Sequence, residues 1–125
     1  MAELNHAAAI PDGRTYSVAL AATAGNVRLI LLPLGKEPIK LTVGPCFTDS
    51  TKATLDSGGY ALGLEADTFT DGAAAPAVAD GVVRADLQSG QVNSIELRGV
   101  RPKSLAVWGG TNNGYAEVTY ERLGA

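Results

Sequence analysis

The spacing of apolar residues constrains the fold of this chain more than any other feature. Short segments in which apolar and polar residues alternate recur along its length, and glycine, proline or asparagine separates them. Alternation with a period of two is the pattern of a half-buried strand, whereas a helix shows apolar residues at every third or fourth position. The alternating segments are residues 16–20, 27–32, 39–43, 60–64, 83–87, 92–97, 105–107 and 116–120. The sequence therefore predicts seven or eight short strands and no long helix.

The residues between these segments predict how the chain turns. Asn113-Gly114 is a two-residue hairpin signal, because both residues tolerate a positive φ, and Ala24-Gly25-Asn26 is a turn of similar composition. We therefore expect a hairpin over residues 16–32 and a closing hairpin over residues 105–120. Gly44-Pro45 predicts the end of the third strand, since proline donates no ladder hydrogen bond.

The length of 125 residues favours a single domain. Residues 1–13 read as an N-terminal arm that ends in a Pro-Asp-Gly turn, and residues 14–125 as one β domain. Short strands at this spacing predict an all-β fold, an antiparallel sandwich or barrel that is jelly-roll-like. Such a sheet leaves edge strands that must be shielded, and oligomerisation is one way to shield them.

Charge and composition exclude several classes of protein. The net charge is −3 and only 18% of residues are charged, which argues against nucleic acid as a partner, because phosphate binding needs clustered Lys and Arg. The tightest basic group, Arg98, Arg101 and Lys103, is predicted to lie on a solvated turn. Cys46 is the only cysteine, so the chain forms no internal disulfide.

The sequence predicts neither a signal peptide nor a membrane span. Its first residues have neither the basic start nor the apolar run of a signal peptide. The longest strongly apolar run, residues 29–32, is too short to span a bilayer. We therefore expect synthesis in a cytoplasm and no membrane partner.

Residues with catalytic or metal-binding chemistry are scarce. His6 is the only histidine and lies in the arm, so neither a catalytic triad nor a His/Cys metal site has the groups it needs. The loop predicted over residues 67–81 carries carboxylates, but its resemblance to an EF-hand fails at Phe69 and Val78. A calcium site of another type would use the carboxylates of this region. These are Asp67, Asp71, Asp80 and Asp86.

Leu55-Asp56-Ser57-Gly58 resembles the apolar-Asp-Thr/Ser-Gly signature of retroviral-type aspartic proteases. Residues 105–109 loosely resemble the second apolar-Gly element of that family. The resemblance implies a homodimer in which two copies of Asp56 share one proton. Gly59 stands where the family usually has alanine, and Trp108 fits the second element poorly. Chance occurrence in a turn is the competing interpretation of Asp-Ser-Gly.

Two further features of the sequence are candidate binding sites, a glycine-rich segment and a set of aromatic residues. Residues 109–114 are glycine-rich but contain no lysine, so they predict a hairpin loop and not a phosphate-binding loop. The aromatic residues predict either core packing or a platform for a sugar ring. They include Trp108, Tyr16, Tyr60, Tyr115 and Tyr120. A carbohydrate- or ligand-binding β module is therefore the alternative function.

The arm of residues 1–13, the β pair of residues 16–32 and the closing residues 105–120 together resemble the small all-β head-decoration (cement) proteins of tailed bacteriophages. That resemblance implies a virion protein, made in the host cytoplasm, that stabilises a capsid by binding neighbouring subunits. It also implies protein partners and a homo-oligomer, possibly a trimer. The sequence assigns no catalytic, cofactor-binding or metal-binding residue, and we expect a non-enzymatic structural protein.

Overall fold

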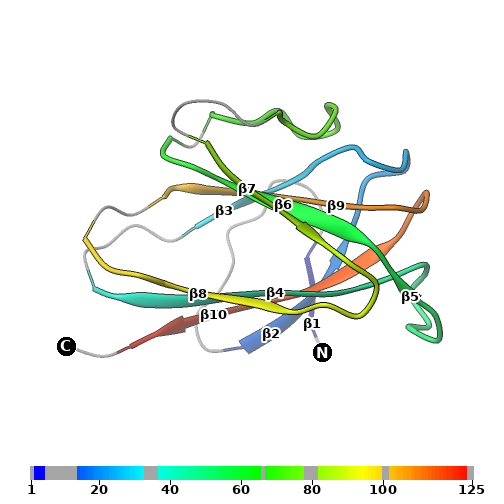
Figure 1. Cartoon of the computed structure of the whole chain (residues 1–125), viewed down its shortest axis with the longest axis horizontal. Coiled ribbons are helices and arrows are strands. Elements are labelled where there is room, and N and C mark those ends of the chain that lie inside the picture. The colour runs from blue at the N-terminus through cyan, green and yellow to red at the C-terminus, as the bar shows by residue number, and fades with distance from the viewer. Residues whose placement is uncertain are drawn as a thin grey trace.

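The computed structural model describes residues 2–4, 14–32, 37–65, 67–77, 82–99 and 102–123. These residues form two stacked β-sheets and no helix, so the predicted all-β sandwich is confirmed (Figure 1). The strands are β1 (Ala2–Leu4), β2 (Arg14–Ala19), β3 (Arg28–Leu31), β4 (Ile39–Phe47), β5 (Leu55–Asp56), β6 (Gly58–Gly63), β7 (Val82–Leu87), β8 (Asn93–Leu97), β9 (Ser104–Gly109) and β10 (Tyr115–Arg122).

The strand order is that of a jelly roll. Sheet A runs β1-β2-β10-β4, and the far edge of β4 pairs with β8 along one half and β5 along the other. Sheet B runs β3-β9-β6-β7. The eight main strands are nested, because β2 pairs with β10, β3 with β9, β4 with β8 and β6 with β7. One long antiparallel hairpin that is rolled into two sheets has this pairing, and double-sheet jelly rolls are built in this way.

Alternation of side chains places the core between the sheets. Val18 of β2, Val43 of β4 and Val118 of β10 face inward from sheet A. Leu105 and Val107 of β9 face them from sheet B. All five side chains are fully buried, as the alternating pattern predicts for one face of each strand.

Both predicted hairpins are wrong. β2 and β3 lie in different sheets, and so do β9 and β10. The turn at Gly25 and the turn at Asn113, which has a φ of 56°, therefore carry the chain from one sheet to the other. A positive φ reverses the chain direction locally, but it does not fix which strand becomes the hydrogen-bonded neighbour.

The prediction that Gly44-Pro45 ends the third strand is also wrong. β4 continues to Phe47 through a bulge, because both Gly44 and Pro45 lie opposite the single residue Glu117 of β10. Gly44 has a φ of 107°, and the Gly44–Pro45 peptide bond is cis. A bulge is one of the places where a sheet accepts proline, since the ladder is already interrupted there.

Two segments with weak sequence signals are ordered in the sheets. Ala2–Leu4, within the predicted arm, pairs in parallel with β2 at the edge of sheet A. Leu55–Asp56 pairs with the end of β4, and β6 begins at Gly58. The remainder of the arm, including His6 and the Pro-Asp-Gly turn, lies outside the described residues.

Replacement of Gly44 by alanine tests the bulge. A Cβ atom at this position would collide with the backbone oxygen of Gln91, and the φ of 107° is unfavourable for any L-residue. Strain of this kind costs ~1–3 kcal/mol before the collision is added, so we expect Gly44→Ala to lower the free energy of unfolding by about 3 kcal/mol or more.

Gly25→Ala is the matched control, because Gly25 has a φ of 80° but no atom within 4 Å of the added Cβ. We expect a loss of ~1–2 kcal/mol from backbone strain alone. Equal losses in urea denaturation of the two variants would contradict the close approach of residue 91 to Gly44.

Candidate functional site

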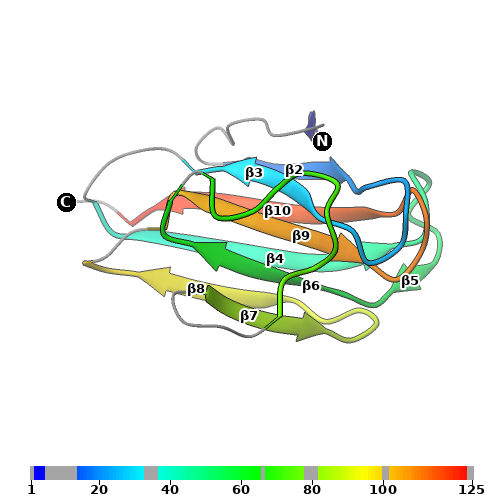
Figure 2. The ribbon, with the colours of Figure 1, turned by 90° about the horizontal axis from the view of Figure 1, so that it is seen from above.

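The outer face of sheet B is covered by the long segment between β6 and β7. Phe69, which is only 7% exposed, packs in a second apolar cluster with Val27, Ala61, Ala106 and Trp108. Figure 2 shows the segment crossing the strands of sheet B. The predicted loop at residues 67–81 is therefore confirmed over its described part, residues 67–77, and that part is a packed cover.

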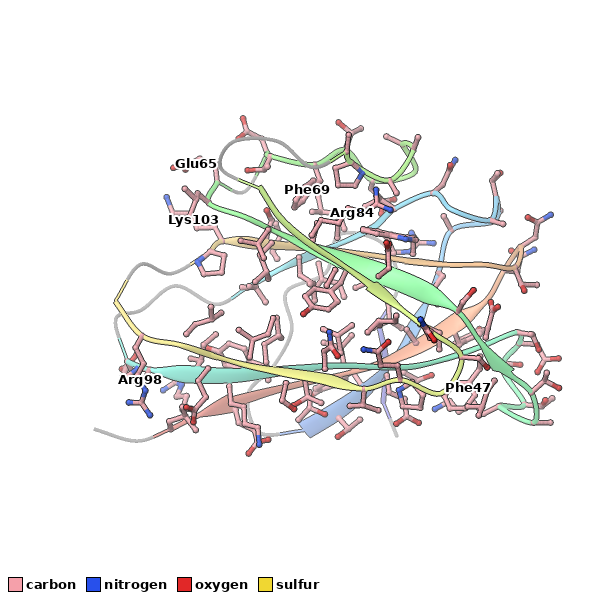
Figure 3. The ribbon with its side chains drawn as sticks, viewed as in Figure 1. Phe47, Glu65, Phe69, Arg84, Arg98 and Lys103 are labelled. Carbon is pink, nitrogen blue, oxygen red and sulfur yellow. The ribbon has the colours of Figure 1, made fainter. Side chains whose placement is uncertain are left out.

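Trp108 lies beneath this cover and is not a sugar platform. The side chain is 5% exposed, and a Cβ atom at Gly59, its cross-strand partner, would come within 2.5 Å of the indole ring. Only glycine therefore lets the ring lie flat across β6. Arg84 of β7 covers the ring, with its guanidinium 5.0 Å from the ring centre. Figure 3 shows Arg84 and Phe69 on this outer side of sheet B.

Most of the other aromatic candidates lie in the core. Tyr16, Tyr60 and Tyr120 are buried between the sheets, and Tyr115 is half-buried. Core packing is therefore the use of Tyr16, Tyr60 and Tyr120, as one of the two interpretations predicted.

Ion pairs and hydrogen bonds fix the cover to the sheet. Asp71 accepts a hydrogen bond from the backbone N–H of Leu29 at 2.8 Å and pairs with Arg28 at 3.3 Å. Arg84 donates to the carbonyl of Pro76 at 2.7 Å and pairs with Asp86 at 3.0 Å. The carboxylates of Asp71 and Asp86 thus serve structural contacts.

The calcium hypothesis gains no support from this geometry. Asp71 and Asp86 are engaged as described, and Asp80 lies outside the described residues. Within the ranges that the structure describes, no three His, Cys, Asp or Glu side chains gather as a metal site would require.

Replacement of Arg84 by alanine tests the cover through the single tryptophan. Loss of the guanidinium removes a cation–π contact and the link to Pro76, so Trp108 should become more exposed. We expect a red-shifted emission, stronger acrylamide quenching and a loss of about 1–2 kcal/mol in unfolding free energy.

Arg98→Ala is the control, since Arg98 is 62% exposed and pairs only loosely with Glu96 at 3.8 Å. Emission should stay unchanged in that variant. The same red shift in both variants would show that Arg84 does not shield the ring.

Asp56 and Cys46 form a small polar cluster where β5 pairs with the end of β4. They are direct cross-strand partners. Asp56 Oδ1 accepts the N–H of Ser57 at 2.9 Å, whereas its buried Oδ2 has no hydrogen-bond partner among the described residues. Burial, and secondly the charge of Asp56, raise the pKa of the Cys46 thiol to about 11.

The two stretches that resemble an aspartic protease do meet in space. Gly110 donates its N–H to the carbonyl of Ser57 at 2.9 Å, and Gly109 lies beside the Asp56 carboxylate. The carboxylate, however, caps its own turn through Oδ1 and buries Oδ2 within the chain. A protease of this class brings two such carboxylates together across a dimer, so that they share one proton.

The raised pKa of Cys46 predicts a loss of stability in alkali. A thiol whose pKa is about 11 when folded and 9.0 when free stabilises the fold fully below pH 9. That contribution disappears between pH 9 and pH 11, and a shift of two units corresponds to at most about 3 kcal/mol.

Denaturation of the wild-type chain and of Cys46→Ala across this pH range checks the prediction. The free energy of unfolding should fall more steeply with pH for the wild-type chain. Parallel curves would mean that Cys46 ionises as easily in the folded state as in the unfolded state.

The outer face of sheet A differs from that of sheet B because the described residues form no apolar cluster over it. Its central row consists of four hydroxyl residues in exact cross-strand register: Thr15, Thr119, Thr42 and Ser94. Thr15 and Thr119 are hydrogen-bonded at 2.7 Å, and Thr42 and Ser94 at 3.0 Å. The result is a flat row of small side chains across β2, β10, β4 and β8.

Charges of both signs flank this row. On one side Lys40 of β4 lies between its cross-strand partners Glu121 of β10 and Glu96 of β8. On the other side Glu117 pairs with Lys52 at 3.5 Å. The Lys52 ammonium also lies 5.9 Å from the centre of the Phe47 ring. The face is therefore polar and carries charges of both signs.

Apolar side chains are exposed elsewhere. Leu55, Leu64, Val83 and Val92 are each about half exposed or more. Leu55 contacts the turn at Gly90, so the corner between β5 and the β7–β8 turn is partly apolar. In the basic group predicted on a solvated turn, Arg98 pairs with Glu96 and Lys103 with Glu65, while Arg101 lies outside the described residues.

Sequence reasoning missed the hydroxyl row. Thr42, Ser94 and Thr119 lie at polar positions of predicted alternating segments, and Thr15 directly precedes one. Their alignment depends on strand order and register, and neither follows from local pattern.

The chain matches no known protein-family model and shows no significant similarity to a curated protein. In the portion described by the structure, no helix is long and apolar enough to cross a membrane.

Proposed function

We propose that the chain is a non-catalytic structural protein that binds the subunits of a larger assembly, specifically a capsid-decoration protein of a virion. The supporting observation is the strand addition at the edge of sheet A. There Ala2–Leu4, from the segment expected to act as an arm, pairs with β2. An edge that accepts an added strand offers main-chain hydrogen bonds, which is how many proteins recognise extended partners.

The fold is compatible with this role. Double-sheet jelly rolls recur in viral capsid domains, although they also occur in lectins and cupins, so this support is by analogy. The edge strand β8 and the exposed Leu55 and Val92 are further positions at which a neighbouring subunit would bind.

The mechanism of such a protein is mechanical. Each copy bridges neighbouring subunits through small contacts, and many repeated contacts over one particle together resist its expansion. Homo-oligomerisation is part of the proposal, and a trimer is the state that the resemblance to phage decoration proteins implies. The particle itself would be assembled in the host cytoplasm.

Deletion of residues 2–13 tests the proposal. The strand β1 makes a three-residue pairing at the edge of sheet A. We expect the fold to persist, with at most about 2 kcal/mol lost. Co-sedimentation with undecorated capsid shells of a tailed bacteriophage that carries this sequence should be abolished.

The intact chain is the positive control in the same sedimentation experiment, and thermal melting verifies that the shortened chain is folded. Normal binding by the shortened chain would show that the arm is not the capsid contact. Failure of the intact chain to bind would contradict the virion role.

A further inference from the structure

The outer face of sheet A carries a second, independent inference, which does not rest on the capsid proposal. Hydroxyl groups both donate and accept hydrogen bonds, so a row of them is complementary to itself. The row of Thr15, Thr119, Thr42 and Ser94 therefore suits contact with the same row of another copy.

The charges around the row select one arrangement of the two copies. In one arrangement, the outer faces of two copies pack together about a two-fold axis. This axis runs parallel to the strands, midway between β10 and β4. Each position on β10 then lies over the register-matched position on β4 of the second copy. Thr119 meets Thr42 of the second copy, and Glu121 meets Lys40 of the second copy, because each of these pairs is matched in register.

The other rows agree with this axis. Glu117 lies over the bulge of the second copy, close to its Lys52, since Lys52 pairs with Glu117 within one chain. Tyr115 lies over the position of Phe47 in the second copy, where the Phe47 side chain is only 8% exposed and the Lys52 ammonium lies over its ring. On the outer face, the matched rows Thr119–Thr42 and Glu121–Lys40 thus bring together two hydroxyls and two opposite charges.

The alternative axis, perpendicular to the strands along the hydroxyl row, is disfavoured. It would place Glu117 over Glu121 of the second copy, because these residues lie two positions to either side of Thr119 on β10. Like charges directly opposite each other oppose association. The charge pattern thus distinguishes the two orientations.

We propose that the outer face of sheet A is an isologous homodimer interface, in which β10 of each copy packs over β4 of the other. A contact of this type is closed, because the same patch is used on both subunits. Face-to-face sheets pack with their strands within about 30° of each other, which the proposed axis satisfies.

The size of the face sets the expected strength. Strands lie ~4.8 Å apart and rise ~3.4 Å per residue, so the four strands around the row cover roughly 20 by 20 Å. Such a contact belongs to the weak class, below ~1,200 Å² of total buried surface. We expect a dissociation constant in the micromolar range or weaker that rises with salt, since paired charges contribute to it.

Two charge reversals test the pairing by complementation. Alone, Lys40→Glu would place a carboxylate over Glu121 of its own second copy, and Glu121→Lys would place an ammonium over Lys40. Each variant should dimerise at least about tenfold more weakly than the wild-type chain in analytical ultracentrifugation. In an equal mixture, both contacts of the mixed dimer join opposite charges, and dimerisation should return.

Mixing the two variants distinguishes the proposed contact between copies from the contact of the same two residues within one copy. Lys40 and Glu121 are also cross-strand neighbours in a single copy, so each variant loses some intrachain attraction that mixing cannot repair. Circular dichroism verifies that both variants are folded. One variant, labelled at its N-terminal amine, is followed alone and then with an excess of the other.

Lys103→Glu and Glu65→Lys form the matched control pair, because these residues make an exposed ion pair at 3.1 Å at the sheet B side of the molecule (Figure 3). Dimerisation should be unchanged in both. A wild-type chain that stays monomeric at millimolar concentration, a trimeric mass, or a mixture that fails to dimerise would each overturn the proposal. A trimeric mass would leave the capsid proposal intact.

Discussion

The pairing of β10 with both β2 and β4 is the interaction on which the rest of the structure depends. It places the last strand in the centre of sheet A, between two strands from the first half of the chain. The hydroxyl contact between Thr15 and Thr119 spans 104 positions of sequence. The chain loses the entropy of closing these long loops before the contacts between distant strands can stabilise it. A nested fold of this type therefore forms slowly relative to helical proteins.

The two sheets have different relations to their surroundings. Sheet B is covered on its outer face around Trp108, where Phe69 and its neighbours form a second core. Sheet A is buried on one face, and its other face presents hydroxyls and balanced charges in register. A jelly roll needs only its inner faces for stability, so the outer face of sheet A is free to be shaped by contact with other molecules.

The sequence predicted the strands well and their partners poorly. Alternation is a local property of a half-buried strand, which is why all eight expected segments coincide with strands. Partner choice is a global property, and the turns at Gly25 and Asn113 look the same whether the chain stays in one sheet or crosses to the other. Gly44-Pro45 predicts a strand end, whereas β4 continues past it as a bulge. The edge partner of β4 changes there from β8 to β5, and neither partner can be identified from the residues around Gly44. Of the candidate sites, the protease-like motif drew attention to Asp56, whereas the hydroxyl row required register.

The bulge in β4 has a consequence for motion. Residues before it are held at the sheet edge by β8, and residues after it by the two-residue strand β5. The ladder at this edge is therefore two short ladders joined at Gly44 and Pro45. Local openings occur in contiguous cooperative units, so we expect an opening that begins at β5 to end at the bulge. The corner that carries Leu55 would then open without disturbing the half of β4 beside the hydroxyl row.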